Sequence, residues 1–310
     1  MTARGRARGL HPAAATHQVR PAARHRLVDP QARAGPQGHH RLGHGQTARA
    51  RRRRRHPGLA RRHPGTTWHE RRAGDRAPAR RSGRAIGRAF AADGDTVVGV
   101  ALEEVDEPAF TRSLVLDCAS AEGAEAAVEA VADVAGRLDV VVLAAAVMPV
   151  APITETTDAQ WRAALDAVLG TAFAVSRAAL PRLAAGRQAD GGAIVAVSSV
   201  NAFLAAPGLP AYAAAKAGLE GLVRQLALEY GPHGVRVNAV APGMIGGEGV
   251  PDAAAGYPLG RAGTAEEVAQ AVRFLAGAGF VTGTVLPVDG GLSIASPAAF
   301  LREDLRGRWI

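Results

Sequence analysis

The chain has 310 residues, of which 47% are hydrophobic and 21% are charged, and a length of this order is typical of about two domains. Its one cysteine, Cys118, excludes an internal disulfide and fits a reducing compartment. No uninterrupted apolar run reaches the ~18 residues of a membrane span. We therefore expect a cytoplasmic protein without a membrane partner.

The charge is divided unevenly along the chain. Residues 1–80 hold 20 arginines, three acidic residues and nine of the ten histidines, whereas acidic residues outnumber basic ones in the remainder. This first segment has no apolar periodicity and few large apolar side chains, so we expect it to be disordered. It could be a basic arm that contacts nucleic acid through the run 51–55, a cleaved transit peptide, or a translation of GC-rich DNA in the wrong frame. We favour the third interpretation, and nucleic acid is not an expected partner.

The genetic code is compatible with that interpretation. Reading one base later from within His69 permits the sequence M-(N/S)-V-A-L-V-T-G-x-x-x-G, which is a start codon, a buried strand and a glycine-rich turn. A second slip near 81–83 is then required. We therefore predict that residues 1–80 are not native sequence, that residues 81–310 form the functional domain, and that this domain starts near residue 69 in the true frame.

The remainder of the chain alternates strands with helices. This alternation predicts a doubly wound, Rossmann-like parallel α/β sheet whose first strand and glycine-rich turn are missing or corrupted, with ligands at the carboxyl ends of the strands. Ser120 is expected to cap the second helix. In chain order we expect a helix at 84–93, strands at 96–101 and 114–116, a helix at 121–137, a strand at 140–144, a helix at 159–184, a strand at 193–197, a helix at 213–230, a strand at 235–240, a helix at 264–276 and a strand at 284–288.

One constellation of residues carries chemistry. Tyr212 and Lys216, the only lysine of the chain, are four residues apart at the start of a predicted helix and project from the same face. A nearby ammonium lowers the pKa of a phenol, which makes Tyr212 a usable general acid or base. Ser198 and Ser199 end the preceding predicted strand, where a hydroxyl can hold a substrate oxygen beside the phenol.

These residues stand in a series of motifs that resembles the short-chain dehydrogenase/reductase family, in particular its 3-oxoacyl-carrier-protein reductase type. The spacing of 13 residues between Ser199 and Tyr212 is usual in that family. The motifs are IVAVSS at 194–199, YAAAK at 212–216, VRVNAVAPG at 235–243, PLGRAGTAEEVA at 258–269 and VTGTVLPVDGG at 281–291.

The resemblance implies an oxidoreductase that uses NAD or NADP to interconvert a secondary alcohol and a ketone, with no metal. Ser199 would bind the substrate oxygen, Tyr212 would exchange the proton, and Lys216 would lower the pKa of Tyr212 and bind the nicotinamide ribose. The residues implied in cofactor binding are Gly83, Asp117, Cys118, Ala144, Ala145, Tyr212, Lys216, Pro242, Gly243 and Ile245.

The chain departs from the family pattern at several places. The glycine-rich turn would place glycines at 77, 81 and 83, and only Gly83 is present. The usual asparagine-rich turn after the third buried strand is LAAA at 143–146. Val168 replaces the asparagine of the usual proton relay, and Gly247 the usual threonine after the P-G turn.

Other positions leave specificity open. Ala101 stands where an aspartate often selects NAD, and Glu103 and Glu104 lie just beyond it. The choice between NAD and NADP therefore remains open. The segment 244–257 is short and small-sided for a substrate lid, which indicates a small or open pocket.

Two other functions remain possible within the same fold. A pseudoenzyme that has lost cofactor binding would act as a binding module or oligomer partner, and an epimerase or dehydratase would share the fold but give other products. Family resemblance also implies a homotetramer or homodimer, for which the apolar stretch 286–300 is a candidate interface.

Overall fold

The computed structural model describes residues 78–185 and 191–308, which lie within one compact unit, Thr66–Ile310. The proposals for a disordered, out-of-frame segment concern residues that lie almost wholly outside this part. The exception is Pro78–Arg80, which form the first turn of the helix that ends at Ala92. Proline suits this place because the first helical position needs no backbone N–H donor.

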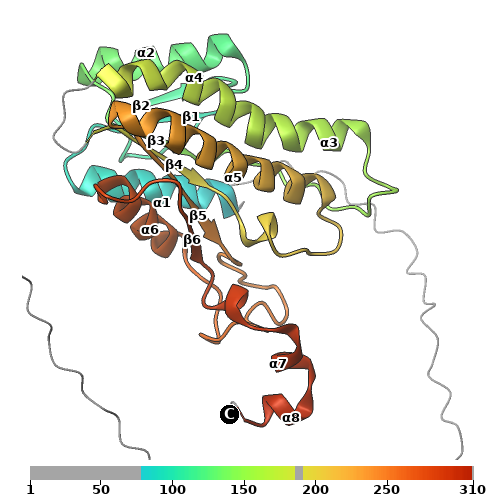
Figure 1. Ribbon diagram of the computed structural model, residues 1–310. Helices are drawn as coiled ribbons and strands as arrows, with labels where there is room; N and C mark the ends of the chain where they lie inside the picture. Colours follow the sequence, from blue (N-terminus) through green and yellow to red (C-terminus); the bar gives the residue numbers. More distant parts are fainter. Residues whose placement is uncertain (1–77, 186–190, 309–310) are drawn as a thin grey trace, which may run out of the picture. The chain divides into compact units, whose positions relative to one another are not determined.

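Helices and strands alternate through the described chain as predicted (Figure 1). Residues 159–184 are helical, but the helix is interrupted by a π-helical turn, and the two short helices at the C-terminus were not expected. The elements are α1 (Pro78–Ala92), β1 (Val98–Ala101), β2 (Arg112–Val115), α2 (Ala121–Ala135), β3 (Val140–Leu143), α3 (Asp158–Leu165), the π-helical turn η1 (Asp166–Gly170), α4 (Thr171–Ala185), β4 (Ala193–Val197), the 3-10 turn η2 (Val200–Ala202), α5 (Pro210–Tyr230), the 3-10 turn η3 (Gly231–His233), β5 (Arg236–Pro242), α6 (Ala265–Gly277), β6 (Val285–Val288), the 3-10 turn η4 (Leu292–Ile294), α7 (Pro297–Leu301) and α8 (Glu303–Arg306).

All the described strands pair in parallel, but they form two sheets. The larger sheet has the order β3-β4-β5-β6, and the smaller one consists of β1 and β2. The register pairs Ile194 with both Val141 and Val237, and Val98 with Arg112. Among the strands that the structure describes, β1 pairs only with β2 and β3 only with β4, so each keeps one unpaired edge. The predicted parallel α/β fold is confirmed, and its sheet is divided between β1 and β3.

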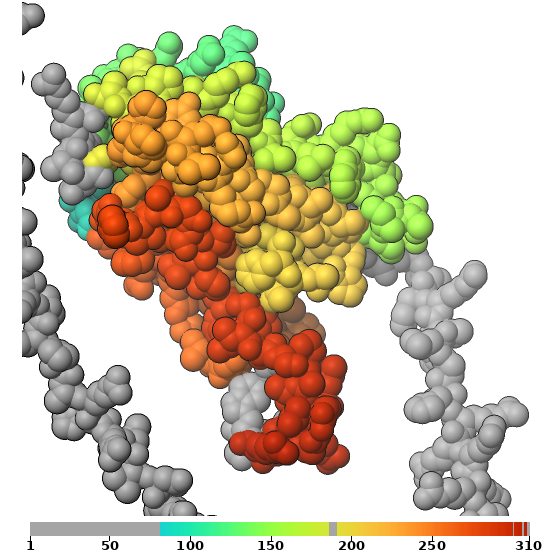
Figure 2. All heavy atoms as spheres, in the orientation of Figure 1, coloured from blue at the N-terminus to red at the C-terminus, as the bar shows by residue number. Residues whose placement is uncertain are grey.

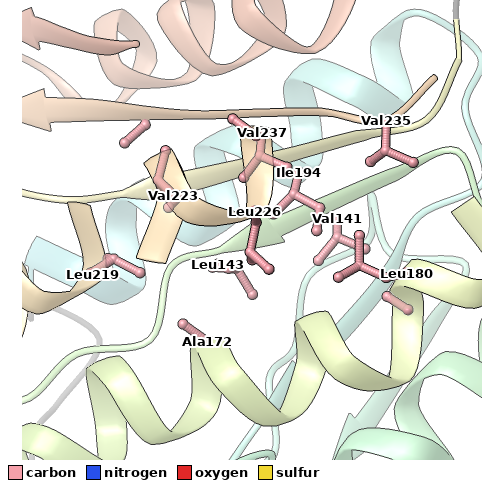
Figure 3. Close-up of a cluster of buried hydrophobic side chains, with 14 of the residues drawn as sticks. Val141, Leu143, Ala172, Leu180, Ile194, Leu219, Val223, Leu226, Val235 and Val237 are labelled. Atoms are coloured by element: carbon pink, nitrogen blue, oxygen red, sulfur yellow. The ribbon is translucent and has the colours of Figure 1, made fainter. Parts of the chain in front are cut away.

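Two buried clusters of apolar side chains cover the two faces of the larger sheet. Alternate residues of a strand point to opposite faces. Ile194 therefore joins the cluster formed with α2, α4 and α5, whereas Val195 joins the cluster formed with α1 and α6. Figure 3 shows the first cluster, in which Ala172 and Leu180 of α4 face the strands. Both faces of β5 are buried along its whole length.

Local caps fix where the helices begin. Ser120 caps α2 as predicted, because its hydroxyl accepts a hydrogen bond from the backbone N–H of Gly123. Thr264 and Glu267 form a reciprocal capping box at the start of α6, and Thr157 and Gln160 do the same for α3.

One long helical stretch, Asp158–Ala185, has the length and mean hydropathy (1.4) of a membrane span. Its buried side chains, among them Ala172, Leu180 and Leu183, contribute to the first apolar cluster. Such a composition is equally that of a core helix.

Candidate active site

Helix α5 carries two of the three predicted catalytic residues near its start. The helix begins at Pro210, so Tyr212 lies in its first turn and Lys216 follows one turn later on the same face. Figure 2 shows α5 at the surface, in yellow to orange, between the green α3–α4 segment and the red C-terminal segment. Its inner face packs against the larger sheet, because Leu219 and Val223 are buried in the first cluster.

Ser199 is the second residue after β4 and the N-cap of the turn η2. It is buried and caps the short turn η2, where its hydroxyl accepts a hydrogen bond from the N–H of Asn201 at 3.2 Å. Ser199 lies near enough to Tyr212 to lower the pKa of its phenol.

Lys216 is almost fully buried, with 2% of its surface exposed. Its Nζ donates a hydrogen bond to the carbonyl oxygen of Val197 at 2.6 Å and lies 5.6 Å from the centroid of the Tyr212 ring. Burial lowers the pKa of Lys216 to about 8, since removal from water disfavours the charged form.

The expected effect of Lys216 on Tyr212 is not found in this structure. Burial raises the pKa of Tyr212, and only the hydrogen bond with Ser199 lowers it. The physical reason is that the Lys216 ammonium is directed to a backbone carbonyl of β4. At neutral pH the phenol of Tyr212 is therefore protonated and able to donate a proton.

The residues implied in cofactor binding follow the carboxyl ends of their strands. Asp117 and Cys118 follow β2, and the exposed Ala145 follows β3 together with Ala144. The Asp117 carboxylate accepts a hydrogen bond from the N–H of Ala119 at 3.0 Å, which shapes the turn into α2. Burial, with the nearby Asp117 charge, raises the pKa of the Cys118 thiol, which keeps it protonated.

Pro242, Gly243 and Ile245 lie at the end of β5. Gly243 is required there, because a β-carbon would approach the Tyr257 ring at 2.9 Å. The Tyr257 hydroxyl in turn accepts a hydrogen bond from the N–H of Met244 at 2.7 Å, which closes the segment 244–257 onto the end of the strand.

Gly83 lies inside α1 rather than in a turn. A β-carbon at this position would meet no atom within 4 Å, so nothing described in the structure requires a glycine there. The place of the missing asparagine, Val168, is a buried position in the π-helical turn, where the side chain packs into the first apolar cluster. Its side chain offers no hydrogen bond to a proton relay.

A cavity of about 490 Å³ lies beside Ile245, between α1 and the N-terminus of α6. Arg81, Arg84 and Arg88 of α1 line it, and their spacing places them on one side of the helix. This row was missed in the sequence, although basic residues three and four positions apart are a readable signal. The remaining lining residues are Ile245, Gly246, Glu248, Ala262, Gly263, Thr264, Ala265 and Glu266.

The N-terminus of α6 and the Arg84 guanidinium favour an anion such as a dinucleotide phosphate in this cavity. Arg81 and Arg88 also pair with Glu248 and Glu107, and Glu266 adds negative charge to the lining. Arg81 also donates a hydrogen bond to the Glu248 carboxylate at 3.1 Å and so spans from α1 to the segment after β5. Arg81 takes the position of a turn glycine in the family pattern, and its side chain occupies part of the cavity.

A parallel α/β sheet with polar residues gathered at its carboxyl edge defines a Rossmann-like protein. The family model described as "Enoyl-(Acyl carrier protein) reductase" matches residues 79–293.

Curated relatives and solved structures agree with this match. The chain is 37% identical to an uncharacterized oxidoreductase of Schizosaccharomyces pombe over 69% of this chain and 88% of that protein. It is 35% identical to a 3-oxoacyl-[acyl-carrier-protein] reductase of Thermotoga maritima over 68% of this chain and 93% of that protein. The ligand-free aldohexose dehydrogenase of Thermoplasma acidophilum superposes with a TM-score of 0.65 at 30% identity, over 70% of this chain and 91% of that structure.

The chain therefore belongs to the short-chain dehydrogenase/reductase family, whose members are NAD(P)-dependent oxidoreductases, and the predicted resemblance is confirmed. It is accordingly an enzyme of the oxidoreductase class.

Proposed function

We propose that the protein interconverts a ketone and a secondary alcohol with NAD or NADP at a site formed by Ser199, Tyr212 and Lys216. The observation that carries this proposal is the geometry at the carboxyl end of β4: the Lys216 Nζ lies 5.6 Å from the centroid of the Tyr212 ring and binds the carbonyl of Val197, two residues before Ser199.

A nicotinamide cofactor supplies the hydride when it is bound. Ser199 holds the carbonyl oxygen of the substrate, and Tyr212 donates its proton to that oxygen as negative charge develops there. The Lys216 Nζ lies 5.6 Å from the centroid of the Tyr212 ring, and Arg84, which lines the cavity beside Ile245, would contact the cofactor's phosphates.

The test is the replacement Tyr212→Phe, which removes the proton donor and keeps the ring. With ethyl acetoacetate as substrate and NADH or NADPH as reductant, kcat should fall by about 10²–10⁴-fold. Affinity for the nucleotide, measured by fluorescence titration, should change little. A variant as active as the wild type would overturn the assignment of Tyr212.

The pH dependence gives a second readout of the same site. Since the pKa of Lys216 is lowered to about 8, the ammonium is present below that pH and lost above it. The value of kcat/KM, which reports the free enzyme, should therefore fall as the pH rises through about 8.

A pseudoenzyme remains the second candidate, because two observations favour it. Arg81 reaches across the cavity to Glu248, and β1 and β3 each have one edge without a partner among the strands that the structure describes. Absence of NADH and NADPH binding in a fluorescence titration would support the pseudoenzyme. Product analysis distinguishes an epimerase or dehydratase from the proposed reductase.

We further propose that the enzyme works in the cytoplasm as a homodimer or homotetramer. Ile294, within the apolar stretch 286–300, is 85% exposed in the single chain, which supports this stretch as an interface. Light scattering after gel filtration measures the number of subunits, and a monomer would contradict the proposal.

A further inference from the structure

Glu220 is a buried acid that the proposed reaction does not use. It lies one helical turn beyond Lys216, on the face of α5 that also carries Tyr212, and is only 8% exposed. Burying a carboxylate costs free energy unless it is hydrogen-bonded. Burial raises the pKa of Glu220, while Ser198 and the neighbouring Arg224 lower it.

The partner of Glu220 is the residue next to Ser199. The Ser198 hydroxyl, 3% exposed, donates a hydrogen bond to the Glu220 carboxylate at 2.7 Å. The N–H of Ser198 also donates to the carbonyl of Val240 in β5 at 2.7 Å. Ser198 is thus held by the neighbouring strand through its backbone and by α5 through its side chain.

Three consecutive residues at the end of β4 therefore contact three successive turns of one face of α5. The carbonyl of Val197 accepts from Lys216, Ser198 donates to Glu220, and Ser199 lies near enough to Tyr212 to lower the pKa of its phenol. Each of the other two contacts includes a residue of the proposed Ser-Tyr-Lys set. The contact between Ser198 and Glu220 includes none. A leucine at position 220 would fill a similar volume without burying a charge.

We propose that Glu220 is a positioning residue, which anchors Ser198 to α5 and thereby holds Ser199 against Tyr212. This inference rests on the proposed function, because Ser199 and Tyr212 are its proposed reacting groups. Glu220 itself touches neither the substrate nor the cofactor.

The experiment compares two replacements at the same position. Glu220→Gln keeps an oxygen that accepts the Ser198 hydrogen bond, whereas Glu220→Leu removes it. With ethyl acetoacetate and NADPH, kcat of Glu220→Leu should fall by about tenfold or more, since small misplacements of reacting groups are costly. KM and nucleotide affinity should stay within about twofold, and Glu220→Gln should restore most of kcat.

Two further variants separate positioning from general damage to the helix. Ser198→Ala should lower kcat as Glu220→Leu does, and combining the two changes should cause no further loss, because both remove the same contact. Glu229→Leu is the matched control, since Glu229 is exposed on the same helix and should leave kcat unchanged. The proposal would be overturned if the fold-losses in kcat of the two single variants multiplied in the double variant. It would also be overturned if Glu220→Gln had a kcat as low as that of Glu220→Leu.

If the wild type reduces no ketone, that result counts against the proposed function and not against the role of Glu220. The role of Glu220 is then tested by a measurement that needs no turnover. The chain has three tyrosines, so tyrosine labelled with ¹³C at Cζ gives few NMR signals, and Tyr212→Phe assigns one of them. Because the hydrogen bond with Ser199 lowers the pKa of Tyr212, Glu220→Leu should move its titration to higher pH, whereas Glu220→Gln should not. An unchanged titration in Glu220→Leu would overturn the positioning role.

Discussion

The two sheets of the described chain differ sharply in burial although both are parallel and flanked by helices. Every residue of β5 is buried, and four of the five residues of β4 are. In the two-stranded sheet no residue is buried, and Val100 and Val115 are 38% and 58% exposed. Composition alone does not explain this difference, because β1 (VGVA) is as apolar as many interior strands.

The difference lies in the neighbours of each strand. β4 and β5 each have a partner on both edges and helices on both faces, whereas β1 and β3 each lack a partner on one edge within the described chain. Unpaired backbone groups at an internal position of an α/β sheet are costly. The division between β1 and β3 therefore marks the place where one more parallel strand would join the two halves.

The largest expected effect comes from supplying that strand. The sequence permitted by the shifted frame from His69 contains V-A-L-V, which has the length and character of a buried strand. A chain in which residues 69–83 are replaced by that sequence and its glycine-rich turn should gain on the order of 5 kcal/mol in the free energy of unfolding, since each buried Val or Leu contributes ~1.5–3 kcal/mol. Urea denaturation measures the gain.

The control replaces V-A-L-V in the same chain by polar residues, which should abolish the gain. Amide hydrogen exchange should show protection of β1 and β3 only with the apolar strand. Equal stability of the two chains would mean that the division is a true feature of this fold. Unshifted gene reads across codons 69–83 would contradict the frameshift itself.

Core replacements sharpen the comparison between the two sheets. Ile194 of β4 has no exposed surface, so Ile194→Ala should lower the free energy of unfolding by about 2–5 kcal/mol. Val115→Ala in β2 removes a smaller and largely exposed side chain and should cost about 0.5 kcal/mol or less. Comparable losses measured by urea denaturation would contradict the asymmetry of burial.

The bounds of strands were predicted best in the larger, well-buried sheet. The strand 193–197 has the bounds of β4, because a short apolar run between turn signals is clear when both faces are buried. The motif spacing also placed Ser199 just after β4 and Tyr212 in the first turn of α5, where the structure has them. The strand predicted at 96–101 is shorter in the structure, where β1 begins at Val98 with fewer neighbours.

Long-range contacts of the site could not be predicted in the same way. Lys216 reaches Val197, and Glu220 reaches Ser198, across about 20 residues of sequence. No periodicity specifies which rotamer a buried side chain adopts or which carbonyl it meets. The π-helical turn at Asp166–Gly170 was missed for a related reason, because its apolar pattern continues that of the flanking helices.

An ion pair with a buried carboxylate joins α1 to the segment before β2 and gives a pH-dependent prediction. Arg88 of α1 donates hydrogen bonds to Glu107, before β2, at 2.9 and 3.0 Å, and this lowers the pKa of Glu107. Glu107→Gln should cost about 1 kcal/mol at pH 7, a modest value because Arg88 is half exposed.

The sign of its pH dependence follows from the direction of the shift. A carboxylate with a lowered native pKa stabilises the fold above its ordinary pKa of about 4.3, and this contribution is lost as the pH falls through the native value. The difference between wild type and Glu107→Gln in thermal unfolding should therefore shrink below about pH 4. Asp106→Asn, an exposed neighbour, is the control and should show little difference at any pH.

The smallest effect is expected where α1 meets the segment after β5. The ion pair between Arg81 and Glu248 is exposed to solvent, so screening leaves it little influence on stability. Glu248→Gln should leave the urea midpoint unchanged at low and at high salt. α1 is held to the larger sheet by Ala85 and Ile86, which are buried beside α6, and these contacts remain in the variant. A lower urea midpoint in Glu248→Gln would instead show that the two sheets depend on this ion pair, because no apolar strand of the described chain joins them.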